Sequence, residues 1–109
     1  MSEVEVLFFQ GCPNWEDALR RVERVSNELG VAPEVTLVEV SDLESAVELR
    51  FLGSPTVRVD GRDVEPGADD RHDFVFACRV YRVDGAVTGV PADEWIRAAL
   101  GRDSSRSSA

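Results

Sequence analysis

Lysine is absent from this 109-residue chain, and acidic side chains outnumber basic ones by 21 to 12, which leaves a net charge of −9. A protein that binds a nucleic-acid backbone needs a basic face, so this balance argues against a nucleic-acid partner. The chain also has no long apolar run and no export signal at its start. We therefore expect no membrane span and no signal peptide, and we expect a cytoplasmic protein.

Several motifs that carry cofactor or metal chemistry are also missing. The sequence contains no HExxH, no P-loop, no GxGxxG and no four-cysteine zinc pattern, so we expect no cofactor and no metal. Cysteine occurs only twice, at positions 12 and 78. In a chain without an export signal, cysteines are more often reactive or simply buried than joined in a structural disulfide.

The apolar pattern predicts one α/β domain over residues 1–101 and a disordered, serine-rich tail over 102–109. Alternating apolar residues predict strands at 3–9, 34–40, 56–59 and 62–65, and a further hairpin within 74–89. One-sided apolar stripes and capping residues predict helices at 15–29, 41–50 and 93–100, the second with a capping box of Ser41 and Glu44. Strands separated by a helix should lie parallel, in a mixed sheet of about four strands flanked by helices.

The stretch LFFQGCPNWEDALRR, residues 7–21, places Cys12 between the first strand and the first helix. Unpaired amides at the start of a helix point toward such a sulfur, and the helix dipole adds partial positive charge. Both effects favour the thiolate, which attacks disulfides and binds soft metals. Pro13 has no amide hydrogen and presets its backbone dihedral, so it suits this turn. The pattern therefore predicts a reactive cysteine thiolate at position 12 that is open to substrates.

The stretches FFQGCPNW, GSPT and EPGADD carry a resemblance to the thioredoxin-like superfamily, and within it to the glutaredoxin-like branch. The first is similar to the turn that holds the family's Cys-x-x-Cys, and the second to the segment with its cis-proline. The third follows the hairpin where glutaredoxins have a glycine pair and an aspartate that contact glutathione. GCPNW, SPTVRVDG and CRVY also resemble small single-motif-cysteine proteins related to DF-family (seleno)proteins, sometimes labelled alkylmercury lyase-like.

This resemblance implies a thioredoxin-like fold and a thiol–disulfide oxidoreductase with Cys12 as nucleophile. It implies a cis bond before Pro55, which would let the main chain of Ser54 pair with an incoming peptide or with glutathione. Asp69 and Asp70 are the implied contacts for a small thiol. The substrate-binding set is therefore predicted to be Pro13, Trp15, Ser54, Pro55, Asp69 and Asp70.

The chain departs from the family's motif at Trp15, which stands where the second cysteine belongs. Trp15 either lies over Cys12 or packs beneath the helix as an ordinary aromatic residue. A dithiol cycle within the motif is excluded, so Cys12 needs a partner from elsewhere. Glutathione, a mycothiol-type small thiol, a client protein disulfide and Cys78 are the candidates.

Cys78 has two interpretations, because it lies among apolar residues in FVFACRVY. It is either a buried strand residue or a resolving thiol that its segment brings to Cys12. A disulfide requires the two Cα atoms to lie within about 7 Å, and spacing alone does not decide this. Arg79 would add positive potential near Cys12 if the same segment folds nearby. His72, the only histidine, belongs either to a solvated acidic loop or to a soft-metal site with both cysteines.

Three functions follow from these observations. The first is thiol-dependent redox chemistry by Cys12, with Cys78 as a second catalytic residue and turnover through a mixed disulfide. The second is a binding or dimerisation module without catalysis, in which the phenylalanine-rich segment covers a partner or a second copy. The third is organomercurial or soft-metal handling by Cys12 and Cys78 together.

Overall fold

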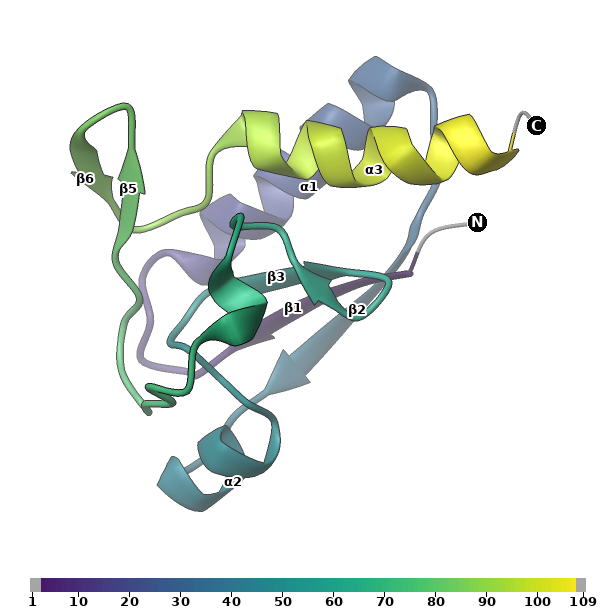
Figure 1. Ribbon diagram of the computed structural model, residues 1–109. Coiled ribbons are helices and arrows are strands. Elements are labelled where there is room, and N and C mark those ends of the chain that lie inside the picture. The colour runs from purple at the N-terminus through teal and green to yellow at the C-terminus, as the bar shows by residue number, and fades with distance from the viewer. Residues whose placement is uncertain (1–2, 108–109) are drawn as a thin grey trace.

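The computed structural model describes residues 3–107, and it describes side chains over residues 3–101. It forms an α/β fold in which a four-stranded mixed sheet and a two-stranded sheet are combined with helices (Figure 1). The elements, in chain order, are β1 (Glu3–Phe8), α1 (Trp15–Leu29), β2 (Glu34–Glu39), α2 (Leu43–Glu48), β3 (Thr56–Val59), β4 (Arg62–Asp63), the 3₁₀ turn η1 (Ala68–Asp70), β5 (Tyr81–Val83), β6 (Ala86–Thr88) and α3 (Asp93–Ser107).

The larger sheet has the strand order β2-β1-β3-β4. β1 and β2 are parallel, as predicted, but β3 runs antiparallel to β1, so the prediction that every helix-separated strand is parallel is wrong for β3. The reason is the length of α2, which has only six residues and spans about 9 Å. Because α2 packs near the end where β2 finishes, the chain does not return along the sheet, and β3 starts from that same end.

Apolar side chains on the two faces of the sheet form separate cores. α1 and α3 lie together over one face (Figure 1), where Val4, Val6 and Val57 pack against Val22 and Ile96. α2 lies at the opposite side, with a smaller core made by Leu7, Val40, Ala46 and Phe51. This alternation along β1 is what a strand buried on both faces produces. The two cores hold the carboxyl end of β1, and therefore the Cys12 turn, between them.

Capping residues explain the end of α1 and the start of α2. Gly30 adopts a left-handed conformation with φ 69° and ends α1, as the sequence predicts. α2 begins at Leu43, two residues later than predicted, because Asp42 is its N-cap and accepts the amide hydrogen of Ser45 at 2.8 Å. This hydrogen bond lowers the pKa of the Asp42 carboxyl. The predicted Ser41–Glu44 capping box is therefore wrong.

The second hairpin forms as predicted, with β5 and β6 joined at Asp84 and Gly85, both at positive φ. It projects from the side of the molecule, beside the start of α3 (Figure 1). α3 runs to Ser107, beyond Leu100, where the sequence places its end. The sequence predicts a disordered tail over 102–109, whereas the backbone is helical as far as Ser107. Residues 108–109 lie outside the described residues. Among the described residues, no helix has both the length and the apolarity to cross a membrane.

Candidate functional site

Cys12 lies in the turn between β1 and α1, as the sequence predicts. Its amide donates to the carbonyl of Phe9 at 3.1 Å, which closes the turn after the strand. Its sulfur accepts the amide hydrogen of Asn14 at 3.4 Å, and Asn14 is the N-cap of α1. The sulfur is thus placed at a helix start, where an amide hydrogen stabilises negative charge on it.

Ser54 and Pro55 face Cys12 from the start of β3. The peptide bond between them is cis, which agrees with the sequence prediction. The Cys12 thiol donates to the carbonyl of Ser54 across 3.5 Å, and the Ser54 hydroxyl accepts the amide hydrogen of Phe9 at 3.4 Å. Both serine and proline are buried. The two predicted residues therefore form the wall of the Cys12 site.

Residues 75–79, which we call the covering segment, run across this wall. Val75 donates its amide hydrogen to the carbonyl of Phe51 at 3.0 Å. Ser54 then donates to Ala77 at 2.9 Å and accepts from Arg79 at 2.8 Å, so that Ser54 and Cys78 form an isolated parallel bridge. Since the carbonyl of Ser54 also accepts from the Cys12 thiol, the segment brings Cys78 to Cys12.

The burial of the two cysteines contradicts the prediction for Cys12 and decides between the two interpretations of Cys78. Cys12 is only 4% exposed, so the expectation that it is open to substrates is wrong. Cys78 is exposed, so its interpretation as a buried strand residue is also wrong. Burial alternates from residue 78 to residue 81, so that Arg79 and Tyr81 are buried while Cys78 and Val80 are exposed. A molecule that arrives from solvent meets the sulfur of Cys78 first.

The Cys12 thiol changes the ionisation of Cys78. Desolvation raises the pKa of Cys78, and the charge of Cys12 and a hydrogen bond with its thiol raise it further. The folded protein therefore holds this proton more tightly than the unfolded chain does. The protonated Cys78 thiol therefore contributes to the free energy of unfolding below the ordinary cysteine pKa. This contribution is lost as the pH rises through the raised pKa of the folded protein.

The variant Cys12→Ala is expected to shift the ionisation of Cys78 toward lower pH. The substitution removes two of the three causes of the raised pKa and leaves desolvation, so the shift is partial. Iodoacetamide alkylation at graded pH, followed by mass spectrometry of the peptide that contains Cys78, measures it in both proteins. Both proteins unfolded in urea are the control and should share one midpoint. An unchanged midpoint in the folded variant contradicts the contact between the two thiols.

Arg79 fixes the covering segment to β4. Its side chain is 1% exposed and donates to Asp63 at 2.7 Å and to Glu65 at 2.7 Å. It also donates to the hydroxyl of Thr56 at 3.1 Å, and its guanidinium lies over the ring of Tyr81 at 4.4 Å. The segment does fold near Cys12, but these partners neutralise the arginine. Arg79 therefore holds the segment in place.

Aromatic rings surround the two cysteines. Trp15 stacks on Phe8 with ring centroids 4.3 Å apart, which matches its interpretation as an ordinary packed aromatic residue. On the other side, Phe9 lies 5.1 Å from Phe76 of the covering segment. Pro13 is exposed beside the turn. Phe76 is itself 40% exposed, so the surface next to Cys78 is partly apolar.

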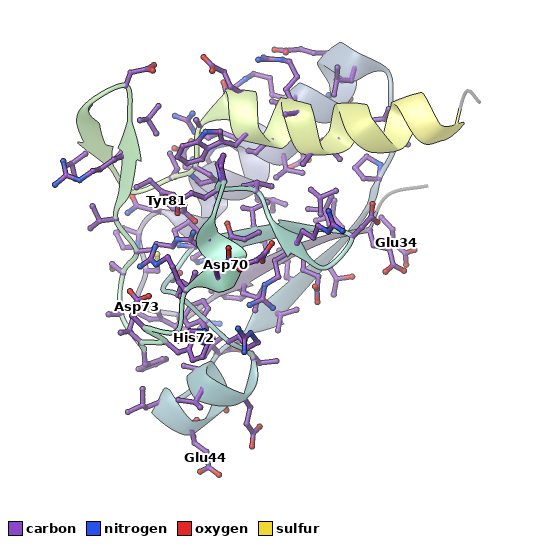
Figure 2. All side chains as sticks on the ribbon, viewed as in Figure 1. Glu34, Glu44, Asp70, His72, Asp73 and Tyr81 are labelled. Carbon is purple, nitrogen blue, oxygen red and sulfur yellow. The ribbon has the colours of Figure 1, made fainter. Side chains whose placement is uncertain are left out.

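Asp69 and Asp70 lie on η1, away from the contacts that surround the cysteines. Asp69 accepts the amide hydrogen of Asp63 at 3.1 Å, so it stabilises the turn after β4. Figure 2 shows Asp70 at η1, with His72 below it on the side of α2 and Asp73 to the left. His72 is exposed, with its ring edge toward Phe74. The structure places none of these side chains in the contacts of Cys12.

The proposed three-ligand metal site does not form. Within the part of the chain whose side chains are described, no three histidine, cysteine or acidic residues gather where they would hold a metal ion. The grouping of Cys12, Cys78 and His72 is therefore wrong as a metal centre. The two sulfurs remain together without the histidine.

Gly53 and Phe76 belong to the site, although the sequence argument did not single them out. Gly53 has φ 118°, and a Cβ there would lie 2.9 Å from the Cβ of Arg79 and 3.1 Å from the carbonyl oxygen of Ala77. Only glycine lets the covering segment approach so closely. The glycine before Ser54-Pro55 was the available signal, since glycine often marks a close approach of two backbones.

Comparison of the chain with protein-family models, with curated proteins and with solved structures gives no match.

Proposed function

We propose that the protein is a thioredoxin-like thiol–disulfide redox protein whose Cys12 and Cys78 cycle between two thiols and one disulfide. The observation that carries the proposal is the shared contact at Ser54. Its carbonyl accepts from the Cys12 thiol, and its main chain pairs on both sides of Cys78. The missing second cysteine of the motif is thereby replaced by a cysteine that is 66 positions further along the chain.

The difference in exposure between the two cysteines supports the following order of reaction. Cys78, as its thiolate, attacks one sulfur of an external disulfide and releases the other half as a thiol. Cys12, as its thiolate, then attacks the sulfur of Cys78, the mixed disulfide breaks, and the second external thiol leaves. Two electrons have passed from the cysteine pair to the external disulfide. The amide hydrogen of Asn14 stabilises Cys12 while it carries negative charge.

The return reaction uses the same geometry with a small thiol as the reductant. Its thiolate attacks the exposed sulfur of Cys78, and Cys12 leaves as the thiolate. A second thiolate then attacks the sulfur of the bound small thiol, which frees Cys78 and yields a small-molecule disulfide. The amide hydrogen of Asn14 donates to the sulfur of Cys12 as that sulfur leaves.

The thioredoxin-like part of the proposal is supported by features that the resemblance implies. The mixed sheet places a strand-to-helix turn with Cys12 opposite Ser54 and Pro55. The proline peptide bond is cis. The covering segment and the β5–β6 hairpin lie outside FFQGCPNW, GSPT and EPGADD, the stretches that carry the glutaredoxin-like resemblance.

The test is whether mild oxidation joins the two cysteines. Treatment of the dilute protein with 2-hydroxyethyl disulfide is expected to yield a monomer that is two hydrogen masses lighter, with a Cys12–Cys78 peptide after digestion. Cys12→Ala should stop at the mixed disulfide on Cys78. Cys78→Ala is the matched control and should react slowly, because Cys12 is buried.

Two other outcomes would contradict the redox function. If both thiols stay reduced in the folded protein but react after unfolding, the site is inert, and the binding-module interpretation gains support. If the disulfide does not form but the protein takes up one equivalent of an organomercurial, and either alanine variant loses that uptake, the pair handles soft metals. Each outcome is read from the intact mass.

A further inference from the structure

The main chain of Ser54 is already paired on both of its hydrogen-bonding groups. Its amide hydrogen is donated to the carbonyl of Ala77 and its carbonyl accepts the amide hydrogen of Arg79, so the bridge places Cys78 beside Ser54. The exposed Cys78 there interacts with the Cys12 thiol by charge and by a hydrogen bond. An extended peptide with a cysteine would use the same two groups if it were added alongside Ser54 as a strand. The chain's own residues thus stand where such a peptide would bind.

The covering segment is fixed in this place by more than its two hydrogen bonds with Ser54. Val75 is hydrogen-bonded to Phe51, and the buried Arg79 is paired with Asp63 and Glu65. Gly53 lets the backbones touch, since a Cβ there would lie 3.0 Å from the Cα of Arg79. To displace the segment, a competing peptide would have to expose a buried charge pair, which is costly.

We propose that the covering segment permanently occupies the main-chain hydrogen-bonding groups of Ser54. The thiol pair therefore exchanges with small-molecule disulfides, and a polypeptide disulfide gains no added affinity from main-chain pairing. This inference rests on the proposed redox function and assigns its substrate class. A peptide disulfide can still collide with the exposed Cys78, but it finds no free main-chain group on Ser54 to add affinity. A small disulfide needs only the exposed sulfur.

The experiment compares two uncharged disulfides, so that the net charge of the protein does not favour either. One is 2-hydroxyethyl disulfide, and the other is the disulfide-linked dimer of a capped, uncharged octapeptide with a central cysteine. The rate at which each disulfide forms the Cys12–Cys78 bond is divided by the rate at which dithiothreitol reduces the same disulfide. This division corrects for the intrinsic reactivity of the two disulfides. The expected ratio of peptide to small disulfide is about one or lower, because main-chain pairing is blocked.

A normalised ratio of about three or more in favour of the peptide overturns the inference, since it requires a free pairing edge. If neither disulfide oxidises the folded pair, the proposed function itself fails, so the two failures are distinguishable. Gly53→Ala tests the cause, because its Cβ would push out Ala77 and Arg79. The variant is expected to raise the normalised ratio above that of the wild-type protein.

Hydrogen exchange keeps the inference testable if Gly53→Ala does not fold. In the wild-type protein, the amide hydrogens of Ser54 and Arg79 should exchange at least about tenfold more slowly than the same amides of the protein unfolded in urea, because both are held in the bridge. Exchange of the Arg79 amide as fast in the folded as in the unfolded protein would mean that the covering segment opens freely, and would overturn the inference.

Discussion

Replacing Arg79 with methionine is expected to lower the free energy of unfolding by about 3–5 kcal/mol. The guanidinium is buried and donates to both oxygens of Asp63, to Glu65 and to Thr56. Methionine fills similar space but leaves the Asp63 carboxylate, whose side chain is 4% exposed, without its cation. Domains of this size have total stabilities of about 5–15 kcal/mol, so the loss is large. Urea unfolding, followed by tryptophan fluorescence, measures it.

Arg97→Met is the matched control. Arg97 pairs with Glu28 at 2.9 Å and both side chains are exposed, and surface ion pairs contribute about 0–1 kcal/mol to stability. A similar loss of stability in both variants would mean that the loss of any arginine side chain, and not the loss of the buried charge pair, causes the effect at position 79. The double variant Asp63→Asn with Arg79→Met should lose less stability than the sum of its single substitutions, because it leaves no unpaired carboxylate at position 63.

The same contacts link stability to the site. Arg79 carries no charge role toward Cys12 in the structure, because its guanidinium is directed to β4 and its end. Its backbone amide, however, is hydrogen-bonded to Ser54, the residue that contacts the Cys12 sulfur. Arg79 is therefore a positioning residue, and Arg79→Met should slow the formation of the Cys12–Cys78 disulfide as well as destabilise the fold.

Local patterns predicted the parts of the fold that depend on neighbouring residues. The stripe along α1, its end at Gly30, and the turn at Asp84 and Gly85 were all read from residues close in sequence. Residues close in sequence do not determine the direction of β3, because that direction depends on where α2 packs against the sheet. Whether a short helix crosses a sheet or stays at its end is a property of tertiary packing.

The sequence predicts Cys12 and the Ser54–Pro55 wall of the candidate site, but it does not predict the position of the covering segment. Cys12 and the Ser54–Pro55 wall follow from a strand-to-helix turn and a recognisable segment. Residues 78–81 reverse the ordinary expectation, since Arg79 and Tyr81 are buried while Cys78 and Val80 are exposed. Apolar alternation favours valine inside, and it was overridden because Asp63 and Glu65 offer buried partners to Arg79. No periodic pattern shows a contact between residues so far apart in the chain.

Oxidation of Cys12 and Cys78 to a disulfide is expected to raise the free energy of unfolding by about 4 kcal/mol. The bond would close the loop from residue 12 to residue 78, which removes much of the freedom of the unfolded chain. The native contacts already bring the two cysteines to Ser54, so little rearrangement is needed to form the bond. Urea unfolding of the oxidised and reduced protein measures the difference, and Cys12→Ala given the same oxidant should show none.

A thermodynamic cycle connects this stabilisation to redox strength. If the disulfide stabilises the fold by about 4 kcal/mol, the fold stabilises the disulfide equally, so the native pair is more reducing than the unfolded pair by about 90 mV. Equilibration with graded ratios of oxidised and reduced dithiothreitol, in buffer and in urea, gives both potentials. Equal potentials would show that the native site does not hold the two sulfurs in bonding geometry. In that case the covering segment could still shield Cys12, but Cys78 could not serve as its redox partner.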